Sequence, residues 1–217
     1  MARPINADGQ RTRQAILDAA LSLFAEKGYF GTSLRDLAGA VGVRESALYN
    51  YFPSKDALFE ALLTADAALK SEQMAALHDL DPADARSVLE RVATLSIERY
   101  LEPRQQQLFR ILMSDGIRLA RDGRINLLER MGSGRKHMYA LLQRLIDAGS
   151  IGDGDVEQLA AAFFGPLLYW RQLHAAGADS SILTDRAAFV RQHVDHFLNG
   201  AASPVVKVSA AARRATA

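Results

Sequence analysis

The residues best suited to recognising another molecule lie in a short stretch near the N-terminus, between Leu34 and Tyr51. Arginine, asparagine and hydroxyl side chains hydrogen-bond base edges in the major groove of DNA, and a small methyl group fits against a thymine. Within this stretch the residues of these types, together with one acid and one tyrosine, stand between apolar residues at helical spacing: Arg44, Glu45, Ser46, Ala47, Tyr49 and Asn50. Residues of these types and spacing are free to face outward into the major groove of double-stranded DNA.

Two short helices that cross steeply are the elements that can position such a surface. Their contact needs a small residue, which Ala38 supplies, and a turn residue that tolerates a positive φ, which Gly42 supplies. It also needs apolar anchors, and the chain has these at Leu34, Leu37, Val41, Val43 and Leu48. An ordinary helical hairpin with a glycine in its turn satisfies the same spacing, so the pattern alone leaves both interpretations open.

Capping signals define the helices around this motif. A first helix is predicted from about Gln10 to Lys27, where Gly28 ends it. A second begins at Thr32 or Ser33, with Asp36 placed as in a capping box. The third ends before Pro53, and Ser54 caps a fourth. The spacing of apolar residues and the breaks between them predict further helices at Ala83–Leu101, Arg104–Arg121, Arg124–Ala148, Asp155–Ala175 and Asp185–Asn199.

Composition narrows the class of protein. The chain has 217 residues, 49% of them hydrophobic, and no cysteine, which excludes disulfides, thiolate zinc sites and a cysteine nucleophile. The polar start of the chain and the absence of cysteine favour a cytoplasmic location. The most apolar stretch, residues 160–170, is about half the roughly 20 residues that a membrane span requires, so no membrane partner is expected. A net charge of +1 gives no bulk electrostatic sign of nucleic-acid binding.

The motif resembles the TetR (tetracycline-repressor-like) family of transcriptional regulators. The resemblance lies in residues 32–38 (TSLRDLA), 42–43 (GV) and 48–58 (LYNYFPSKDAL), and it covers about Gln10 to Leu62. It implies an all-α fold with an N-terminal three-helix DNA-binding domain at 8–55 and a larger helical effector-binding and dimerisation domain at 56–200. Residues 201–217 are predicted to be a disordered basic tail.

The resemblance also implies roles for single residues. Tyr49 and Lys55 are expected to contact DNA phosphate, and Thr32 is expected to contact phosphate from the start of the second helix. Base edges are expected to be contacted by Arg44, Glu45, Ser46 and Asn50, and Ala47 is expected to place its methyl group against a thymine.

Arg44 departs from the family pattern, which has a serine or threonine there to cap the recognition helix. The cap is therefore missing or supplied otherwise, and Arg44 is free to reach either a guanine edge or a phosphate. Glu45 beside it either accepts a hydrogen bond from a cytosine amino group or is simply a solvated helix residue.

The stretch Asp155–Ala175 is apolar nearly all the way round, which predicts two buried faces for this helix. One face would meet the core, and the other would meet a second copy of the chain, with the last helix completing a four-helix homodimer interface. The residues predicted at this interface are Phe163, Phe164, Leu167, Leu168, Phe189, Val190, His193 and Phe197.

The resemblance further implies a pocket for a small-molecule effector, which is not identified, and repression as the commoner mode of action. No cofactor and no metal site are expected. Large residues on stretches predicted to be interior are the candidate ligand contacts, although core packing is the favoured interpretation for each of them: Tyr100, Phe109, Met113, His137, Met138, Tyr139 and Trp170.

Two other classes of function, an enzyme and a helical adaptor, fit the sequence less well. An enzyme would need a catalytic motif, and the sequence has no Gly-x-Ser-x-Gly elbow, no His-Glu-x-x-His and no Walker glycine-lysine pair. A helical adaptor that binds only protein would leave Tyr49, Lys55 and the outward residues of the third helix without a role. The sequence therefore favours a DNA-binding regulator.

Overall fold

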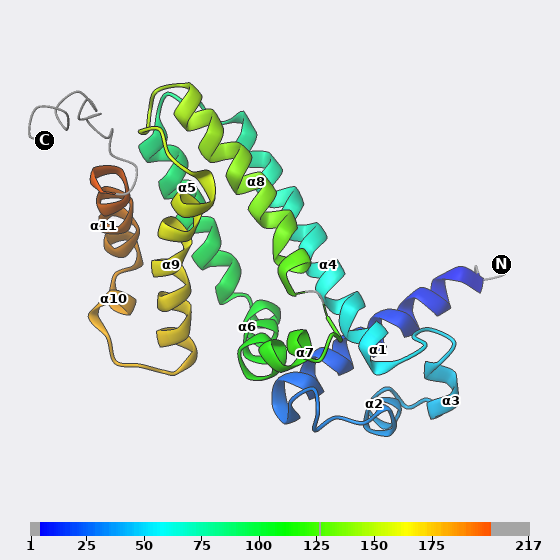
Figure 1. Cartoon of the computed structure of the whole chain (residues 1–217). Coiled ribbons are helices and arrows are strands. Elements are labelled where there is room, and N and C mark those ends of the chain that lie inside the picture. The colour runs from blue at the N-terminus through cyan, green and yellow to red at the C-terminus, as the bar shows by residue number, and fades with distance from the viewer. Residues whose placement is uncertain (1–4, 126, 201–217) are drawn as a thin grey trace, which may run out of the picture. The chain divides into compact units, whose positions relative to one another are not determined.

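The computed structural model describes residues 5–125 and 127–200, except for the side chains of residues 5–7, 67–76, 78 and 127–134. Every regular element within these ranges is helical, as predicted (Figure 1). The elements are α1 (Ile5–Lys27), α2 (Leu34–Val41), α3 (Glu45–Leu48), α4 (Lys55–Ala75), η1 (Ala76–Asp79), α5 (Ala85–Leu101), α6 (Pro103–Ile111), η2 (Leu112–Gly116), α7 (Ile117–Arg121), α8 (Leu127–Asp147), α9 (Val156–Ala175), α10 (Ser181–Thr184) and α11 (Arg186–Asn199).

The chain divides into two compact units. One comprises Met1–Ala75 and Glu98–Lys136, and the other comprises Ala76–Ile97 and His137–Ala217. This division differs from the predicted boundary after residue 55, because α1 packs on α6 as well as on α2 and α4. The first unit therefore contains the predicted DNA-binding segment together with α4, α6, η2 and α7.

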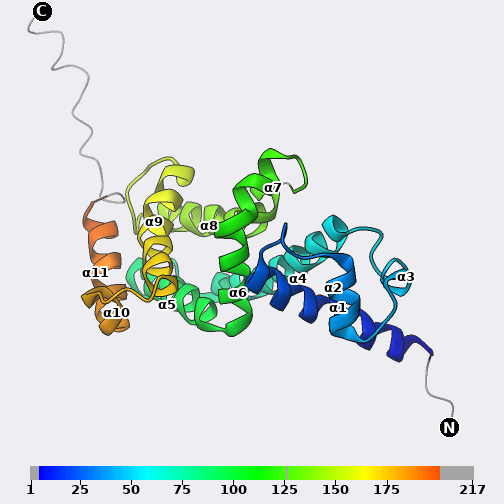
Figure 2. The same ribbon diagram turned by 90° about the horizontal axis from the view of Figure 1, so that it is seen from below.

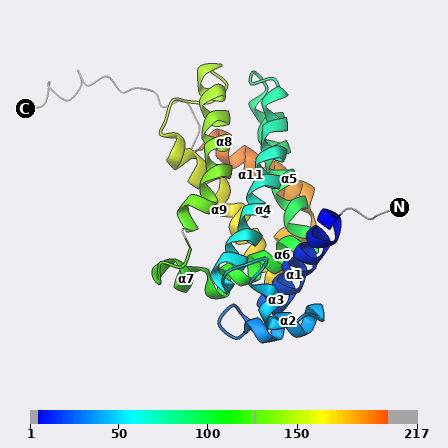
Figure 3. The ribbon, with the colours of Figure 1, turned by 90° about the vertical axis from the view of Figure 1, so that its right-hand side faces the viewer.

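The first unit has one continuous apolar core. Phe24 of α1, Tyr29 of the following loop and Phe59 of α4 are buried, and their rings meet in tilted or edge-to-face contacts at centroid distances of 5.3–5.9 Å. Leu37 and Leu48 anchor α2 and α3 in this core, and Leu34, Val41 and Val43 pack against it. Figures 1 and 3 show α2 and α3 at one end of the unit, next to α1 and α4. The predicted anchors thus occupy the expected positions.

In the second unit, α9 contacts α10 and α11 (Figure 2). Phe163 of α9 meets Phe197 and His193 of α11 at centroid distances of 5.2 and 4.9 Å. The indole Nε1 of Trp170 donates to the carbonyl of Ile182 at 3.1 Å, which holds α10 against α9. Asp155 and Asp185 accept hydrogen bonds from the first amides of α9 and α11, as capping aspartates do.

Three elements differ from the sequence-based expectation. The first helix begins at Ile5, earlier than predicted. The helix predicted over Arg104–Arg121 is interrupted by the π-helical turn η2, within which Gly116 is buried. The short helix α10 begins at Ser181, where the predicted break Gly177–Ser181 ends, and no helix is predicted there from the sequence.

The predicted basic tail at 201–217 lies outside the described residues. Among the helices that are described, none combines the length and the apolar character needed to cross a bilayer.

Candidate nucleic-acid interface

Helix α2 begins at the predicted capping box. The Ser33 hydroxyl accepts a hydrogen bond from the amide of Asp36 at 3.1 Å, and the Ser33 amide donates to Oδ2 of Asp36 at 2.9 Å. These bonds, followed by the nearby positive charges of Lys27 and Arg35, lower the pKa of Asp36. The capping box therefore fixes the residue at which α2 starts.

The turn between α2 and α3 depends on Gly42. Its φ of +74° lies in the left-handed region, which residues with a Cβ rarely adopt. The amide of Gly42 donates to Gly39 O at 3.2 Å, and the amide of Val43 donates to Ala38 O at 3.0 Å. These bonds satisfy carbonyls at the end of α2, and the chain then turns toward α3.

Helix α3 is one turn long and ends earlier than predicted. Leu48 is its buried anchor, and the chain continues through Tyr49–Phe52 in tight turns in which both Tyr51 and Phe52 donate to Leu48 O at 2.9 Å. Pro53 follows directly, and a proline disfavours helical backbone in the residue before it. The segment therefore changes direction into α4.

The side chains predicted to read DNA surround this anchor. Arg44, Glu45, Ser46 and Asn50 are exposed, Ala47 is half-buried, and Tyr49 is 51% exposed despite its large ring. Arg44 is the N-cap residue of α3, and its side chain makes no capping hydrogen bond. The cap that the family pattern would supply is thus missing, and the six residues all lie within the short segment 44–50 around α3.

Thr32 is placed differently from the expectation. Its side chain is buried, and its hydroxyl donates to Gly28 O at 2.9 Å and lies 3.2 Å from Leu23 O. These interactions of the hydroxyl hold the loop before α2 against the end of α1. Its predicted contact with phosphate therefore needs correction, because the group does not reach the surface.

Lys55, at the first residue of α4, also turns inward. Its Nζ donates to Tyr29 O and to Thr32 O, both at 2.8 Å, and lies 4.3 Å from the centre of the Tyr29 ring. Burial, followed by the positive charge of Arg124, lowers the pKa of Lys55. The ammonium group thus joins α4 to the loop between α1 and α2.

The candidate effector contacts are divided between the two units. Tyr100, Phe109 and Met113 lie in the first unit, where the rings of Tyr100 and Phe109 meet edge to face at 5.3 Å. The other four lie in the second unit, with Met138 and Trp170 buried and the remaining two half-buried: His137, Met138, Tyr139 and Trp170. Met113 is 49% exposed, so the interpretation that it faces the interior is wrong.

The predicted dimer residues are also divided. Five of them are buried within the second unit, which corrects the expectation that their side chains face a partner: Phe163, Leu167, Val190, His193 and Phe197. Phe163 of α9 contacts His193 and Phe197 of α11. Phe164 and Phe189 are half-buried, and Leu168 is 42% exposed. The sequence reasoning missed Tyr169, which is 56% exposed beside Leu168.

Comparison with known proteins identifies the class to which this architecture belongs. Residues 16–62 match the family model of bacterial regulatory proteins of the tetR family. Over 201 residues the chain is 28% identical to the transcriptional repressor KstR2 of Rhodococcus jostii, covering 90% of this chain and 93% of that protein. It is also 34% identical over 113 residues to the transcriptional regulator AcrR of Shigella flexneri. The chain is a TetR-family transcriptional regulator.

The relatives match this TetR-family chain over different lengths. The alignment with AcrR covers 52% of this chain and spans 53% of AcrR, about half of that relative. The structure of FadR from Bacillus subtilis, solved with stearoyl-CoA, matches with a TM-score of 0.69 and 22% identity over 86% of this chain and 98% of that chain. This likeness extends the shared fold through both units.

Membership of the TetR family settles the choice between classes of function. The family consists of helix-turn-helix regulators, so the chain is not an enzyme. The matched segment, residues 16–62, contains the capping box, the turn at Gly42 and the exposed residues around α3.

Proposed function

We propose that this TetR-family regulator binds operator DNA as a homodimer, represses transcription, and is released from DNA by a small-molecule effector. The observation that carries the proposal is the arrangement around α3. Leu48 is 2% exposed and anchors the helix, while Arg44, Ser46 and Asn50 are exposed around it. A helix anchored on one side and polar on the other fits the major groove.

The roles of the exposed residues follow from their chemistry. Arg44 carries a planar guanidinium that pairs with two acceptors of guanine or with a phosphate, and Asn50 pairs with adenine. Tyr49, 51% exposed at the end of α3, is suited to a phosphate oxygen through its hydroxyl. Glu45 is suited to a cytosine amino group, and Ala47 and Ser46 complete the surface.

Reading an operator with two half-sites requires two recognition helices held about one DNA turn apart. The face of α9 that this chain leaves exposed supplies a surface for a second copy. It combines small residues, which allow close approach of two helices, with large apolar ones: Ala161, Ala162, Gly165, Leu168 and Tyr169. We propose that the homodimer forms through this face, with Phe164 and Phe189 at its margin.

Repression and release by an effector are proposed by analogy with relatives. KstR2 is named as a repressor, and FadR of Bacillus subtilis was solved with stearoyl-CoA, a small-molecule ligand. We propose a small organic effector for this chain as well. Of the predicted contacts, Tyr100 and Phe109 are large aromatic residues of the same unit whose rings meet at 5.3 Å, and we propose that these two contact such a ligand.

The test uses the purified chain and fragments of its own genome. We expect it to retain fragments from a few upstream regions, with an affinity that falls steeply as salt concentration rises. Arg44→Ala should lower the affinity for these fragments and widen the range of sequences that the chain retains. Arg191→Ala, which removes an exposed arginine of α11, should change neither the affinity nor the range of sequences. Failure to bind any duplex at low salt would favour a helical adaptor instead.

A further inference from the structure

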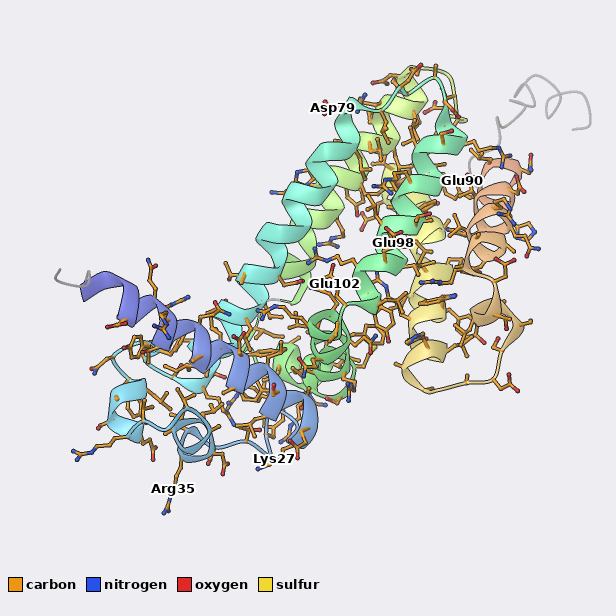
Figure 4. All side chains as sticks on the ribbon, turned by 180° about the vertical axis from the view of Figure 1, so that it is seen from behind. Lys27, Arg35, Asp79, Glu90, Glu98 and Glu102 are labelled. Carbon is orange, nitrogen blue, oxygen red and sulfur yellow. The ribbon has the colours of Figure 1, made fainter. Side chains whose placement is uncertain are left out.

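A hydrogen bond from Tyr29 joins the two ends of the helix-turn-helix segment, residues 34–52. Tyr29 lies in the loop before this segment, and Figure 4 labels the residues on either side of that loop, Lys27 at the end of α1 and Arg35 in the first turn of α2. The Tyr29 hydroxyl donates to Oδ1 of Asp56, which lies in the first turn of α4, after the segment. The bond joins residues 27 positions apart, so the chain between them forms a closed loop.

Tyr29 is the fixed partner in this bond. Its side chain is fully buried, and its ring centre lies 5.3–5.4 Å from those of Phe24, Phe30 and Phe59. Burial, followed by the hydrogen bond to Asp56, raises the pKa of Tyr29, so the hydroxyl keeps its proton and remains a donor. The core of the first unit therefore determines where this hydroxyl lies.

Asp56 depends on its partners for the position of its carboxylate. Its side chain is 42% exposed, so packing does not fix the group. The oxygen that accepts from the Tyr29 hydroxyl also lies 3.4 Å from Nη1 of Arg124, which follows α7. Arg124 is itself 44% exposed, and ion pairs at such exposure are weak. The bond from the buried hydroxyl is thus the stronger of the two restraints on Asp56.

Helix α3 needs restraints of this kind because it is only four residues long. A single helical turn has little stability of its own, so tertiary contacts set its orientation. Leu37 and Leu48 supply apolar contacts to the core from within the segment. Such contacts are non-directional, whereas a hydrogen bond has a preferred distance and angle. The bond between Tyr29 and Asp56 supplies that direction at both ends of the segment.

We infer that Tyr29 and Asp56 are positioning residues for DNA binding, whose hydrogen bond fixes both ends of the helix-turn-helix segment and so holds α3 in the orientation that the DNA requires. Neither residue is assigned a contact with DNA. The inference rests on the proposed function, because the surface that the bond positions is the one around α3. DNA affinity should therefore fall when the bond is removed, although every residue of that surface is retained.

Tyr29→Phe removes the hydroxyl and keeps the ring. Binding is measured on a genomic fragment that the chain retains and on a random-sequence duplex, at a temperature at which circular dichroism shows the variant to be folded. We expect affinity for both probes to fall about tenfold, because a hydrogen bond to a charged group shifts an equilibrium by this order. The slope of log K against log salt concentration should not change, because no phosphate contact is lost.

Ile16→Val is the control for stability. Ile16 is buried in the same core, on α1, so the variant should lower the melting temperature and leave DNA affinity unchanged. Unchanged affinity in Tyr29→Phe would overturn the inference. The same conclusion would follow if Ile16→Val lost as much affinity as Tyr29→Phe, because the loss would then reflect stability alone.

Asp56 is tested with two variants of equal charge. Asp56→Asn keeps an oxygen that accepts from the Tyr29 hydroxyl, whereas Asp56→Leu has a similar shape and no acceptor. Asp56→Asn should therefore bind DNA more tightly than Asp56→Leu. In a chain that also carries Tyr29→Phe this difference should vanish, because the two side chains act through one bond. A difference of the same size in that background would overturn the inference.

Amide hydrogen exchange tests the positioning without DNA. Tyr29→Phe should speed exchange in residues 34–52 and leave exchange in α9 unchanged. Unchanged exchange in residues 34–52 would overturn the inference, whatever the DNA affinity. Failure of the unmodified chain to bind either probe would overturn the proposed function, and the exchange rates would then still decide whether the bond between Tyr29 and Asp56 orders the segment.

Discussion

The backbone amide of Tyr29 donates a hydrogen bond of 2.7 Å to Oδ2 of Asp115. Tyr29 lies in the loop that leads into α2, and Asp115 lies in the π-helical turn η2, so this bond joins segments 86 residues apart in the chain. Gly28, at φ +76°, makes room for it, because a Cβ there would lie 3.0 Å from the same carboxylate oxygen. The DNA-binding loop is thus fixed in part by η2.

Asp115→Ala removes the acceptor from this bond. Since hydrogen bonds to charged groups contribute about 1.5–3 kcal/mol, we expect a loss of that order in the free energy of unfolding, measured by urea denaturation. Asp115→Asn keeps an acceptor oxygen and should lose less. Asp122→Ala is the control, because Asp122 lies 3.8 Å from Arg118 Nε and 3.9 Å from Arg121 Nε at the surface, where such pairs contribute about 0–1 kcal/mol. Equal losses for Asp115→Ala and Asp122→Ala would contradict the prediction.

Arg44→Ser should separate the stability of α3 from its binding to DNA. Arg44 is an N-cap residue without a side-chain capping bond, and serine at that position accepts a hydrogen bond from the helix amides. We expect thermal unfolding to show a gain of about 0.5–1 kcal/mol, together with weaker binding to retained genomic fragments. Arg44→Ala supplies no cap, so it should weaken binding without stabilising the chain. A gain in affinity for Arg44→Ser would show that the guanidinium does not contact DNA.

His193 should make stability depend on pH. It is 6% exposed between Phe163 and Phe189, and its Nε2 has no hydrogen-bond partner within the described residues. Burial lowers the pKa of His193 from its ordinary value of 6.5, while a hydrogen bond to the backbone of Phe163 opposes part of the shift. In this pH range the unfolded chain binds the proton more readily than the folded one, so stability should fall as the pH drops below about 6.5.

Thermal unfolding at a series of pH values measures this effect. His193→Leu should remove part of the decline below pH 6.5, whereas His196→Gln, which removes an exposed histidine whose charge is the smallest of the causes that shift the pKa of His193, should leave most of the decline in place. A decline of the same size in the His193→Leu variant would assign the pH dependence to other groups.

Leu168→Glu should yield monomers. Leu168 is 42% exposed on α9, so a charged side chain there is compatible with the folded chain but would be buried against a second copy. Sedimentation gives the mass, and circular dichroism checks that the helices are retained. Ile117→Glu is the matched control, because Ile117 is 76% exposed on α7 and belongs to the first unit, whereas α9 belongs to the second. A dimer that persists in Leu168→Glu would exclude this face of α9 as the interface.

The sequence by itself was sufficient for the features that depend on neighbours along the chain. The capping box of Ser33 with Asp36 and the left-handed turn at Gly42 both join residues within four positions of one another. Their geometry is set by backbone sterics and by hydrogen bonds that form locally. The family motif is made of such features, and for this reason the helix-turn-helix could be predicted from residue types and spacing.

Tertiary structure decided the direction of side chains whose partners are distant in sequence. Lys55 turns toward Tyr29 and Thr32 because their carbonyls lie beside it, and Asp115 meets Tyr29 only when α6 and η2 pack against α1. In α9, apolar nearly all round, packing against α11 buries Phe163 and leaves Leu168 exposed. Periodicity alone does not choose between such faces, because burial depends on which helix lies opposite.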